Sequence, residues 1–451
     1  MNLKTKISKL TKSELLELLV QLAETDENIE TMLEYKLSTN TDEIKESKKL
    51  IRQYINRYKS KGFIMWRNVG PSLQGAEMVL EKGRGKLAAG EEEMAVRMGI
   101  AVLSIVVVML QYADDSGGEV GNIINESLTL ISDAASEAIE TDEKRQQEKL
   151  FQHIMKESSH KRYDGWSEWR YDLLRIGAIF SIHTSMREKL EKRLGELLEG
   201  ISDSTWSKTY EVKEIKLLQL EIFEVNQELE KAKQFIYSNL QYRPFREKAI
   251  EIALKDKSFE AAVELCKEGQ AQDKQYPGLV SQWKKYELQA YKALGDTKKQ
   301  RGLLLEFVYS NDFEAYNELK ELYDPEEWKV KVEEIFKIFE EKGLKGIYAE
   351  IAKDEKRPDK LLHLCKKDIY QIQHLYPYLL NNYALEADEL FKQFIRYQAE
   401  PAGDRKKYRS VCRVIKEYKA AFGDSKFLEL KEELKEKYKR RPTFLDELDK
   451  V

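Results

Sequence analysis

The chain has 451 residues, which is long enough for two or three domains. Hydrophobic residues make up 42% and charged residues 35%, a composition typical of helical proteins with solvated charged faces. Aromatic residues reach 10%, which excludes a disordered chain, and the net charge of −4 excludes a global basic field that would attract nucleic acid. Three widely separated cysteines give no disulfide framework and suit a reducing cytosol: Cys266, Cys365 and Cys412.

The N-terminal segment, residues 1–62, is predicted to contain three helices. In the first, Thr11 and Glu14 have capping-box spacing, and leucines at helical intervals follow them. These leucines alternate with glutamates, so we expect no signal peptide here. Gly62 is expected to be the C-cap of the third helix. The second and third helices are predicted over 27–37 and 41–58.

The most apolar stretch of the chain is Met94–Ala113. From Met98 to Leu110 it carries no charge, and a helix made from it is apolar on every face, so it must be buried all round. It is shorter than the roughly 20 apolar residues that a membrane span requires, which favours a core helix over a membrane anchor. We therefore predict a helical bundle over residues 63–241, organised on this buried helix.

Other parts of the bundle are indicated by their apolar periodicity. A loop is predicted at 114–118, and the span 212–240 has so few breakers that it is either one long helix or two helices joined without Gly or Pro. Further helices are predicted over 71–86, 120–135, 141–157 and 166–180.

From residue 242 to 451 the pattern changes to short helices that alternate with brief turns, such as the turn Gly295-Asp296. Helix pairs of this kind bury their faces against the next pair, and their irregular period of about 30 to 40 residues resembles a tetratricopeptide repeat. The predicted fold is therefore all-α, with an N-terminal helical bundle followed by a tetratricopeptide-like helix-pair solenoid. The predicted helices include 246–254, 258–269, 279–294, 297–310, 312–322, 325–342, 344–352 and 358–365.

Seven short segments resemble one protein family: 10–19, 26–30, 261–269, 294–296, 316–320, 326–328 and 438–448. Together they are similar to the long helical region that follows the zinc finger in bacterial SWIM zinc-finger proteins. The finger itself needs a Cys-x-Cys and a Cys-x-His pair, which this sequence lacks, so its zinc ligands cannot be assigned here. The resemblance implies a Swi/Snf-type helicase ATPase as a possible partner.

Chemical motifs are scarce. The five histidines share no metal-ligand spacing, and no cysteine or serine lies in a recognisable catalytic context. The glycines of 83–86 and 117–121 do not reproduce a phosphate-binding loop and indicate turns or helix caps. Asp114 and Asp115 lack further acidic partners at calcium-loop spacing and are expected to solubilise the end of the buried helix. We expect no active site, no metal and no cofactor.

The strongest candidate site is a basic strip over residues 405–441, where fourteen Lys or Arg residues stand against six acids. Arg409, Arg413 and Lys416 share one helical face, and such a stripe could neutralise nucleic-acid phosphates. The alternative is a solvated face whose charges pair with acids on neighbouring helices. The residues proposed to bind nucleic acid or a partner are Arg405, Lys406, Arg409, Arg413, Lys416, Lys439, Arg440 and Arg441.

Two functions are consistent with these features. The first is a non-enzymatic protein-binding scaffold or adaptor in the bacterial cytosol, because stacked helix pairs form a concave groove that usually holds peptides or proteins. The alternative is a nucleic-acid-binding accessory subunit that uses the basic strip and works with a helicase-type ATPase. Neither function involves a membrane.

Overall fold

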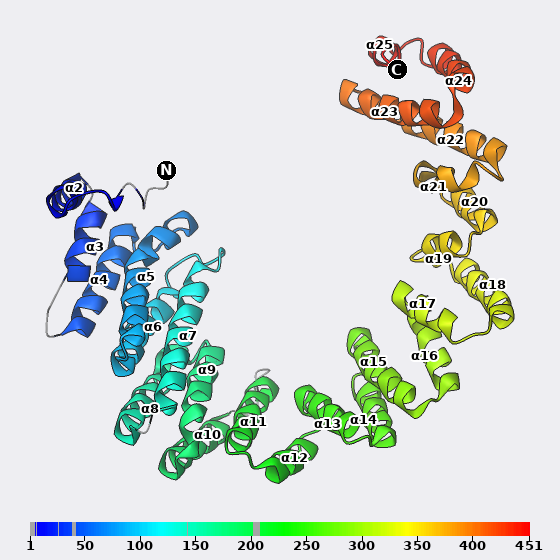
Figure 1. Ribbon diagram of the computed structural model, residues 1–451. Helices are drawn as coiled ribbons and strands as arrows, with labels where there is room; N and C mark the ends of the chain where they lie inside the picture. The colour runs from blue at the N-terminus through cyan, green and yellow to red at the C-terminus, as the bar shows by residue number, and fades with distance from the viewer. Residues whose placement is uncertain (1–4, 6, 26, 38–41, 142, 202–207) are drawn as a thin grey trace. The chain divides into compact units, whose positions relative to one another are not determined.

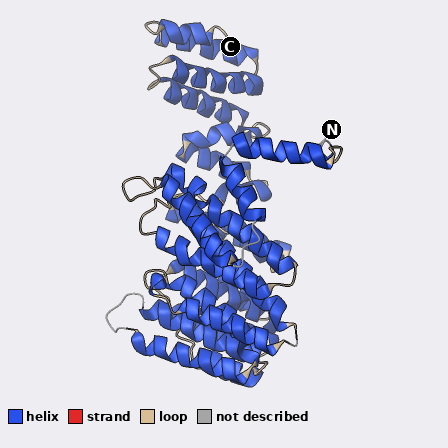
Figure 2. Cartoon of the chain, turned by 90° about the vertical axis from the view of Figure 1, so that its left-hand side faces the viewer, coloured by secondary structure: helices blue, strands red, loops and turns tan. Residues whose placement is uncertain are grey.

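The fold is all-α, as predicted. The computed structural model contains 24 α-helices, three short 3₁₀ helices and only two isolated β-bridges in the residues that it describes (Figures 1 and 2). Two compact units divide the chain, Met1–Ala249 and Ile250–Val451. None of the helices described is long and apolar enough to cross a membrane. The described residues are 5, 7–25, 27–37, 42–141, 143–201 and 208–451.

The first unit is a helical bundle that takes in the segments predicted as 1–62 and 63–241 (Figure 1). The span 212–240, left open between one helix and two, forms two helices with a break at Asn226 to Glu228. The helices are α2 (Lys12–Thr25), α3 (Glu27–Leu37), α4 (Glu43–Tyr58), α5 (Trp66–Ala88), α6 (Glu92–Met109), α7 (Glu119–Ile139), α8 (Lys144–Ser158), η1 (Lys161–Tyr163), α9 (Ser167–Ala178), η2 (Ile179–Ile182), α10 (Thr184–Gly200), α11 (Lys208–Val225), α12 (Leu229–Tyr237) and most of α13 (Arg243–Lys255).

Helix α6 is the central element of this unit, as its sequence predicts. It packs against α4, α5, α7 and α8, and most of its residues, including Val96 and Val102, have no exposed surface. The prediction of burial all round is wrong for one stripe, because Arg97, Ile100 and Ser104 are half-buried and line a pocket. Its helix ends at Met109, so the last residues of the predicted stretch form the turn that leads into the loop at 114–118. Burial of the apolar surface of α6 stabilises the unit.

Two glycines allow the central helices to approach one another closely. A Cβ atom on Gly99 of α6 would lie 2.7 Å from Ile131 Cγ1, and one on Gly83 of α5 would lie 2.6 Å from Leu130 Cδ2. Gly83 therefore serves helix packing, and the prediction of a turn or cap at 83–86 is wrong because this segment lies inside α5. The prediction of a turn or cap is confirmed at 117–121, because Gly118 has a φ of 73° and is the N-cap of α7.

The third helix ends differently from the prediction. Helix α4 stops at Tyr58 and is followed by an extended residue, so Gly62 is not its C-cap. Instead, Lys61 and Gly62 both have positive φ and form a two-residue turn. The turn is closed by two backbone hydrogen bonds, of 2.9 and 3.0 Å, between Ser60 and Phe63. The glycine is needed for this turn and not for the helix end.

The first helix has the predicted capping box. The Glu14 carboxylate accepts a 2.7 Å hydrogen bond from the Thr11 backbone N–H, and the Thr11 hydroxyl accepts one of 3.3 Å from the Glu14 N–H. Helix α2 contacts α3, but none of its residues is buried, and Leu18, Leu19 and Leu22 are exposed. The cap chemistry therefore starts this helix without help from a core.

The second unit consists of consecutive helices that pack on their neighbours in the chain, which confirms the helix-pair stacking. The turn at Gly295-Asp296 forms as predicted. Gly295, with a φ of 69°, ends one helix, and the Asp296 carboxylate caps the start of the next by accepting a 3.0 Å hydrogen bond from the Lys299 N–H. The helices are α14 (Phe259–Gln272), α15 (Pro277–Leu294), α16 (Thr297–Tyr309), α17 (Phe313–Glu321), α18 (Pro325–Lys342), α19 (Tyr348–Asp354), α20 (Pro358–Lys367), η3 (Ile369–Gln371), α21 (Ile372–Leu379), α22 (Ala384–Ala399), α23 (Arg405–Phe422), α24 (Asp424–Lys437) and α25 (Pro442–Leu448).

Buried aromatic residues with a polar atom join successive helices of this unit. The Trp283 indole N–H donates a 2.7 Å hydrogen bond to Asp273, and the Trp328 indole N–H donates one of 2.8 Å to Glu355. Each pair connects a helix to the C-cap residue of a neighbouring helix, so the aromatic ring supplies buried area while the hydrogen bond satisfies its polar atom. This arrangement fixes the register of one helix against the next.

Candidate binding surface on the C-terminal helices

The predicted basic strip begins on α23, a strongly amphipathic helix. Asp404 caps its start by accepting a 2.9 Å hydrogen bond from the Lys407 N–H. Apolar residues such as Val411, Ile415 and Tyr418 are buried, whereas the basic residues between them are exposed. The 3.6-residue period therefore places the positive charges on the side away from the core.

Helix α25 folds back onto α23 and neutralises part of the strip. Phe444 is fully buried, with its ring 5.0 Å from Tyr408, so it fixes the position of the helix. Arg405 then lies 3.1 Å from the Asp446 carboxylate, and Arg409 lies 3.3 Å from that of Glu447. The buried Phe444 and Leu448 thus make α25 the cap of the last helices of this unit.

The acids of α25 are held in their charged form by the surrounding cations. Lys450, which donates hydrogen bonds to Asp446 and Glu447, lowers the pKa of both carboxyl groups. Lys435 lowers the pKa of Asp449 in the same way. The C-terminal acids and the nearby bases therefore form one network of opposite charges.

Two more of the predicted residues serve the fold. The Arg441 guanidinium donates hydrogen bonds of 3.0 to 3.1 Å to the backbone carbonyls of Ala399, Glu400 and Ala402, at the end of α22. It thereby caps a helix C-terminus, a position that favours a cation. Lys439 forms a 2.7 Å ion pair with Glu436, one turn earlier in the chain.

The remaining four predicted residues are exposed, and in the part of the chain that the structure describes none of them forms an ion pair: Lys406, Arg413, Lys416 and Arg440. The first three share the outward face of α23. The structure thus divides the eight predicted residues into four that have partners within the C-terminal helices and four that remain available. The acids Asp446, Glu447 and Asp449, which follow Arg441 closely in the sequence, were the signal from which this pairing could have been predicted.

A second feature of this unit was not found from the sequence. Tyr370 of η3 and Tyr397 of α22 are 49% and 56% exposed, and their rings lie 5.5 Å apart, almost perpendicular. Tyr370 also packs edge-on against the buried Phe394 at 5.7 Å. An exposed aromatic pair that rests on a buried ring is held in place before any partner arrives. The two tyrosines lie 27 positions apart, so the sequence carries no local signal for the pair.

Groups with reactive chemistry are engaged in structure. Burial raises the pKa of Cys365 to about 12 and that of Cys412 to about 11, which leaves both thiols protonated near neutral pH. No group of three or more potential ligands is assembled for a metal within the described ranges. Asp115 accepts hydrogen bonds from the backbone N–H groups of Val120 (2.8 Å) and Gly121 (3.2 Å), so it caps the start of α7.

Comparison with known proteins adds little to this geometry. No family model matches the sequence, and no curated protein matches it. Among solved structures, the chain aligns with a circular tandem repeat protein of novel repeat topology at 14% identity and a TM-score of 0.23. The alignment covers 90% of this chain and 93% of that one. A TM-score this low does not indicate a shared fold, and the helical repeat architecture follows from the helices and their packing.

Proposed function

We propose that the protein is a non-enzymatic protein-binding scaffold of the bacterial cytosol, with its partner held by the C-terminal, tetratricopeptide-like unit. The observation that carries this proposal is the exposed pair Tyr370 and Tyr397. Aromatic side chains dominate protein interfaces because they bury much area while losing few rotamers. The stacked helices supply a rigid frame for such a contact.

The test is a comparison of affinity purifications with the full chain as bait. We expect a specific set of proteins to be retained by the wild type and lost by the double variant Tyr370→Ala/Tyr397→Ala. The matched control is Tyr276→Ala, an equally exposed tyrosine of the same unit (54%), which should retain the set. Identical recovery by the wild type and the double variant would contradict the proposed surface.

A second function is favoured by Lys406, Arg413 and Lys416, which share one exposed face of α23. In this alternative the protein is a nucleic-acid-binding accessory of a Swi/Snf-type ATPase, the partner implied by the resemblance to SWIM proteins. Contacts to phosphates release counterions, so binding to a DNA duplex should weaken steeply as salt rises.

The alternative is tested by measuring duplex binding across a salt series. Arg413→Glu/Lys416→Glu should abolish binding without disturbing the fold, because neither side chain forms an ion pair in the described structure. Lys329→Glu/Lys337→Glu, on exposed positions of α18, is the matched change of charge elsewhere in the unit. Absence of binding by the wild type at any salt concentration would leave the scaffold as the working function.

A further inference from the structure

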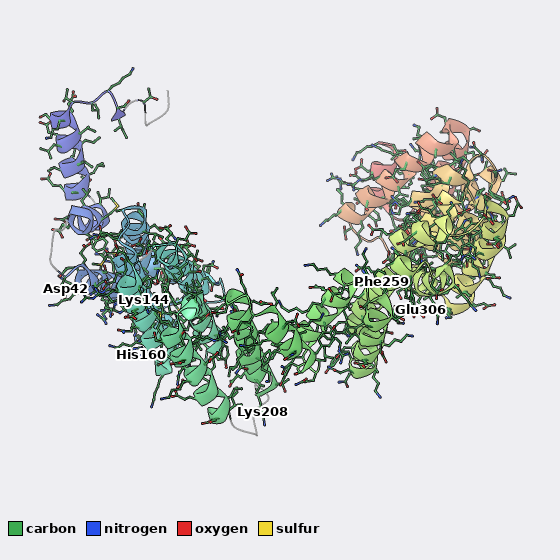
Figure 3. All side chains as sticks on the ribbon, turned by 60° about the horizontal axis from the view of Figure 1, so that its bottom comes forward. Asp42, Lys144, His160, Lys208, Phe259 and Glu306 are labelled. Atoms are coloured by element: carbon green, nitrogen blue, oxygen red, sulfur yellow. The ribbon has the colours of Figure 1, made fainter. Side chains whose placement is uncertain are left out.

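The N-terminal unit contains a pocket of about 380 Å³ whose walls come from three helices and the turn that follows them. Helix α4 contributes Lys48, α6 contributes Arg97, and α8 contributes Lys156. Arg162 of η1, the Glu157 carboxylate and the imidazoles of His153 and His160 also line it (His160 is labelled in Figure 3). The volume lies within the range of about 300 to 1,000 Å³ that is usual for small-ligand sites.

The lining is strongly basic although the whole chain is acidic. Four cations face a single carboxylate, Glu157, so the pocket carries a net charge of +3 with its imidazoles neutral. That carboxylate is already engaged, because it lies 2.6 Å from the Arg162 guanidinium and accepts a 2.8 Å hydrogen bond from the Tyr163 hydroxyl. It is therefore committed to one wall of the pocket and does not neutralise the others.

Three of the cations lack a counter-charge. Lys48 and Arg97 are half-buried and Lys156 is exposed, and within the described residues none of them has a carboxylate within 4 Å. A half-buried cation without a partner is unfavourable, since it gives up part of its hydration for no protein contact. Arg97 is the only cation of α6, a helix whose remaining residues are mostly apolar.

Two acids on α4 and α6, Glu43 and Glu93, already interact with other side chains. Glu93, one turn before Arg97, lies 3.4 Å from Lys149 and 3.7 Å from His153. Glu43, at the start of α4, forms ion pairs of 2.9 Å with Lys82 and 3.0 Å with Lys86. Apart from Glu157, no acid among the described residues lines the pocket, so a bound anion would supply the negative charge that the lining lacks.

We propose that this pocket binds a phosphoryl group, carried by a small molecule or by a phosphorylated side chain. A phosphate monoester brings between one and two negative charges and several acceptor oxygens, which matches cations that converge from separate helices. A single carboxylate would leave two of the three unpaired cations without a counter-charge. Ile44 and Ile100 line the pocket as well and give an apolar surface for the group that carries the phosphate. The inference does not depend on the scaffold proposal.

The experiment is calorimetric titration of the full chain with inorganic pyrophosphate at low ionic strength. We expect saturable one-to-one binding that Arg97→Gln weakens by about tenfold or more, the loss expected for one charged hydrogen bond. The matched control is Arg67→Gln, an exposed arginine of α5 that does not line the pocket, which should bind like the wild type. A second arm uses a phosphoserine peptide and its unphosphorylated twin. Tighter binding of the phosphopeptide than of pyrophosphate would identify a protein-borne phosphate, and the reverse would identify a small molecule.

Two outcomes would overturn the proposal: no saturable binding of pyrophosphate or phosphopeptide to the wild type, or equal affinity of Arg97→Gln and Arg67→Gln for pyrophosphate. Should Arg97→Gln prove misfolded by its thermal transition, Lys48→Gln/Lys156→Gln decides, because both side chains reach solvent, and it should weaken binding by about tenfold or more. The variant Tyr370→Ala/Tyr397→Ala should bind pyrophosphate normally, so failure of the scaffold proposal and failure of this one are distinguishable.

Discussion

Helices α6 and α23 have the same length, 18 residues, and opposite relations to solvent. The first is buried around most of its circumference and is central to the N-terminal unit, whereas the second buries one face and exposes a row of cations. A helix surrounded by four others is constrained at most of its positions, while an amphipathic helix leaves half of its positions available for binding. The comparison shows where this protein is restricted by packing and where it is available for contacts.

The largest expected effect comes from placing a charge in α6. Val102 has no exposed surface, so Val102→Asp buries a carboxylate without a partner and should destabilise the protein by about 4 kcal/mol or more. Urea unfolding followed by circular dichroism measures the loss. The control is Arg413→Asp on the exposed face of α23, which should stay within about 0.5 kcal/mol of the wild type. Similar losses in both variants would break the contrast between the two helices.

A cavity in α23 should have the next largest effect. Ile415 has no exposed surface, and Ile415→Ala should cost about 2 to 5 kcal/mol through lost burial and an unfilled cavity. The adjacent residue provides the comparison, because Lys416→Ala changes an exposed side chain and should be nearly neutral. Both are measured by chemical unfolding. Equal stability of the two variants would show that the buried face of α23 is not packed as described.

Two glycines of the N-terminal unit, Gly99 and Gly85, differ in whether a neighbouring helix lies close to them. Gly99→Ala places a methyl group 2.7 Å from Ile131 and should destabilise the protein by about 1 to 3 kcal/mol. Gly85→Ala, on an exposed position of α5 with open space around it, should instead stabilise it by about 0.5 to 1 kcal/mol. Thermal unfolding of the two variants should therefore shift in opposite directions, and a gain in the first would contradict the close helix contact.

The smallest effect concerns the docking of α25. Its carboxyl groups at Asp446, Glu447 and Asp449 have pKa values below their ordinary ones because cations surround them. A lowered pKa contributes stability that is complete above the unfolded pKa and is lost as pH falls through the folded pKa. Acidification from about pH 5 should therefore loosen α25.

Hydrogen exchange of the α25 amides, corrected for intrinsic rates, measures this loosening. The triple variant Asp446→Asn/Glu447→Gln/Asp449→Asn provides the reference, because it lacks the titrating groups. Its protection at neutral pH should be lower than that of the wild type and should change less on acidification. If the hydrogen-exchange protection of α25 in the wild type does not decrease on acidification, the burial of Phe444 and not the ion pairs keeps the helix docked.

Much of the helical fold could be predicted from the sequence. Periodicity and caps placed a helix such as Pro325–Lys342 at the bounds that the structure has, because these signals act within one or two turns. The errors at Gly62 and Gly83 have a common cause. A glycine signals a turn, a cap or a close helix contact equally well, and only the neighbouring helix distinguishes among them.

The candidate sites were less predictable. The sequence showed the basic strip but not its partners, since Arg409 and Glu447 lie 38 positions apart and meet only when Phe444 is buried. The Tyr370–Tyr397 pair and the pocket around Arg97 were missed for the same reason. Each is assembled from residues on different helices, and a single sequence does not show which helix faces lie together.

The helical fold, the positions of most helices and the burial of most of α6 follow from local periodicity and from the cost of exposing apolar surface, and both can be read from the sequence. Which charges are neutralised and which remain available depends on the packing of the helices. Ion pairing depends on distances of a few ångströms between residues far apart in the chain, and those distances are set by packing.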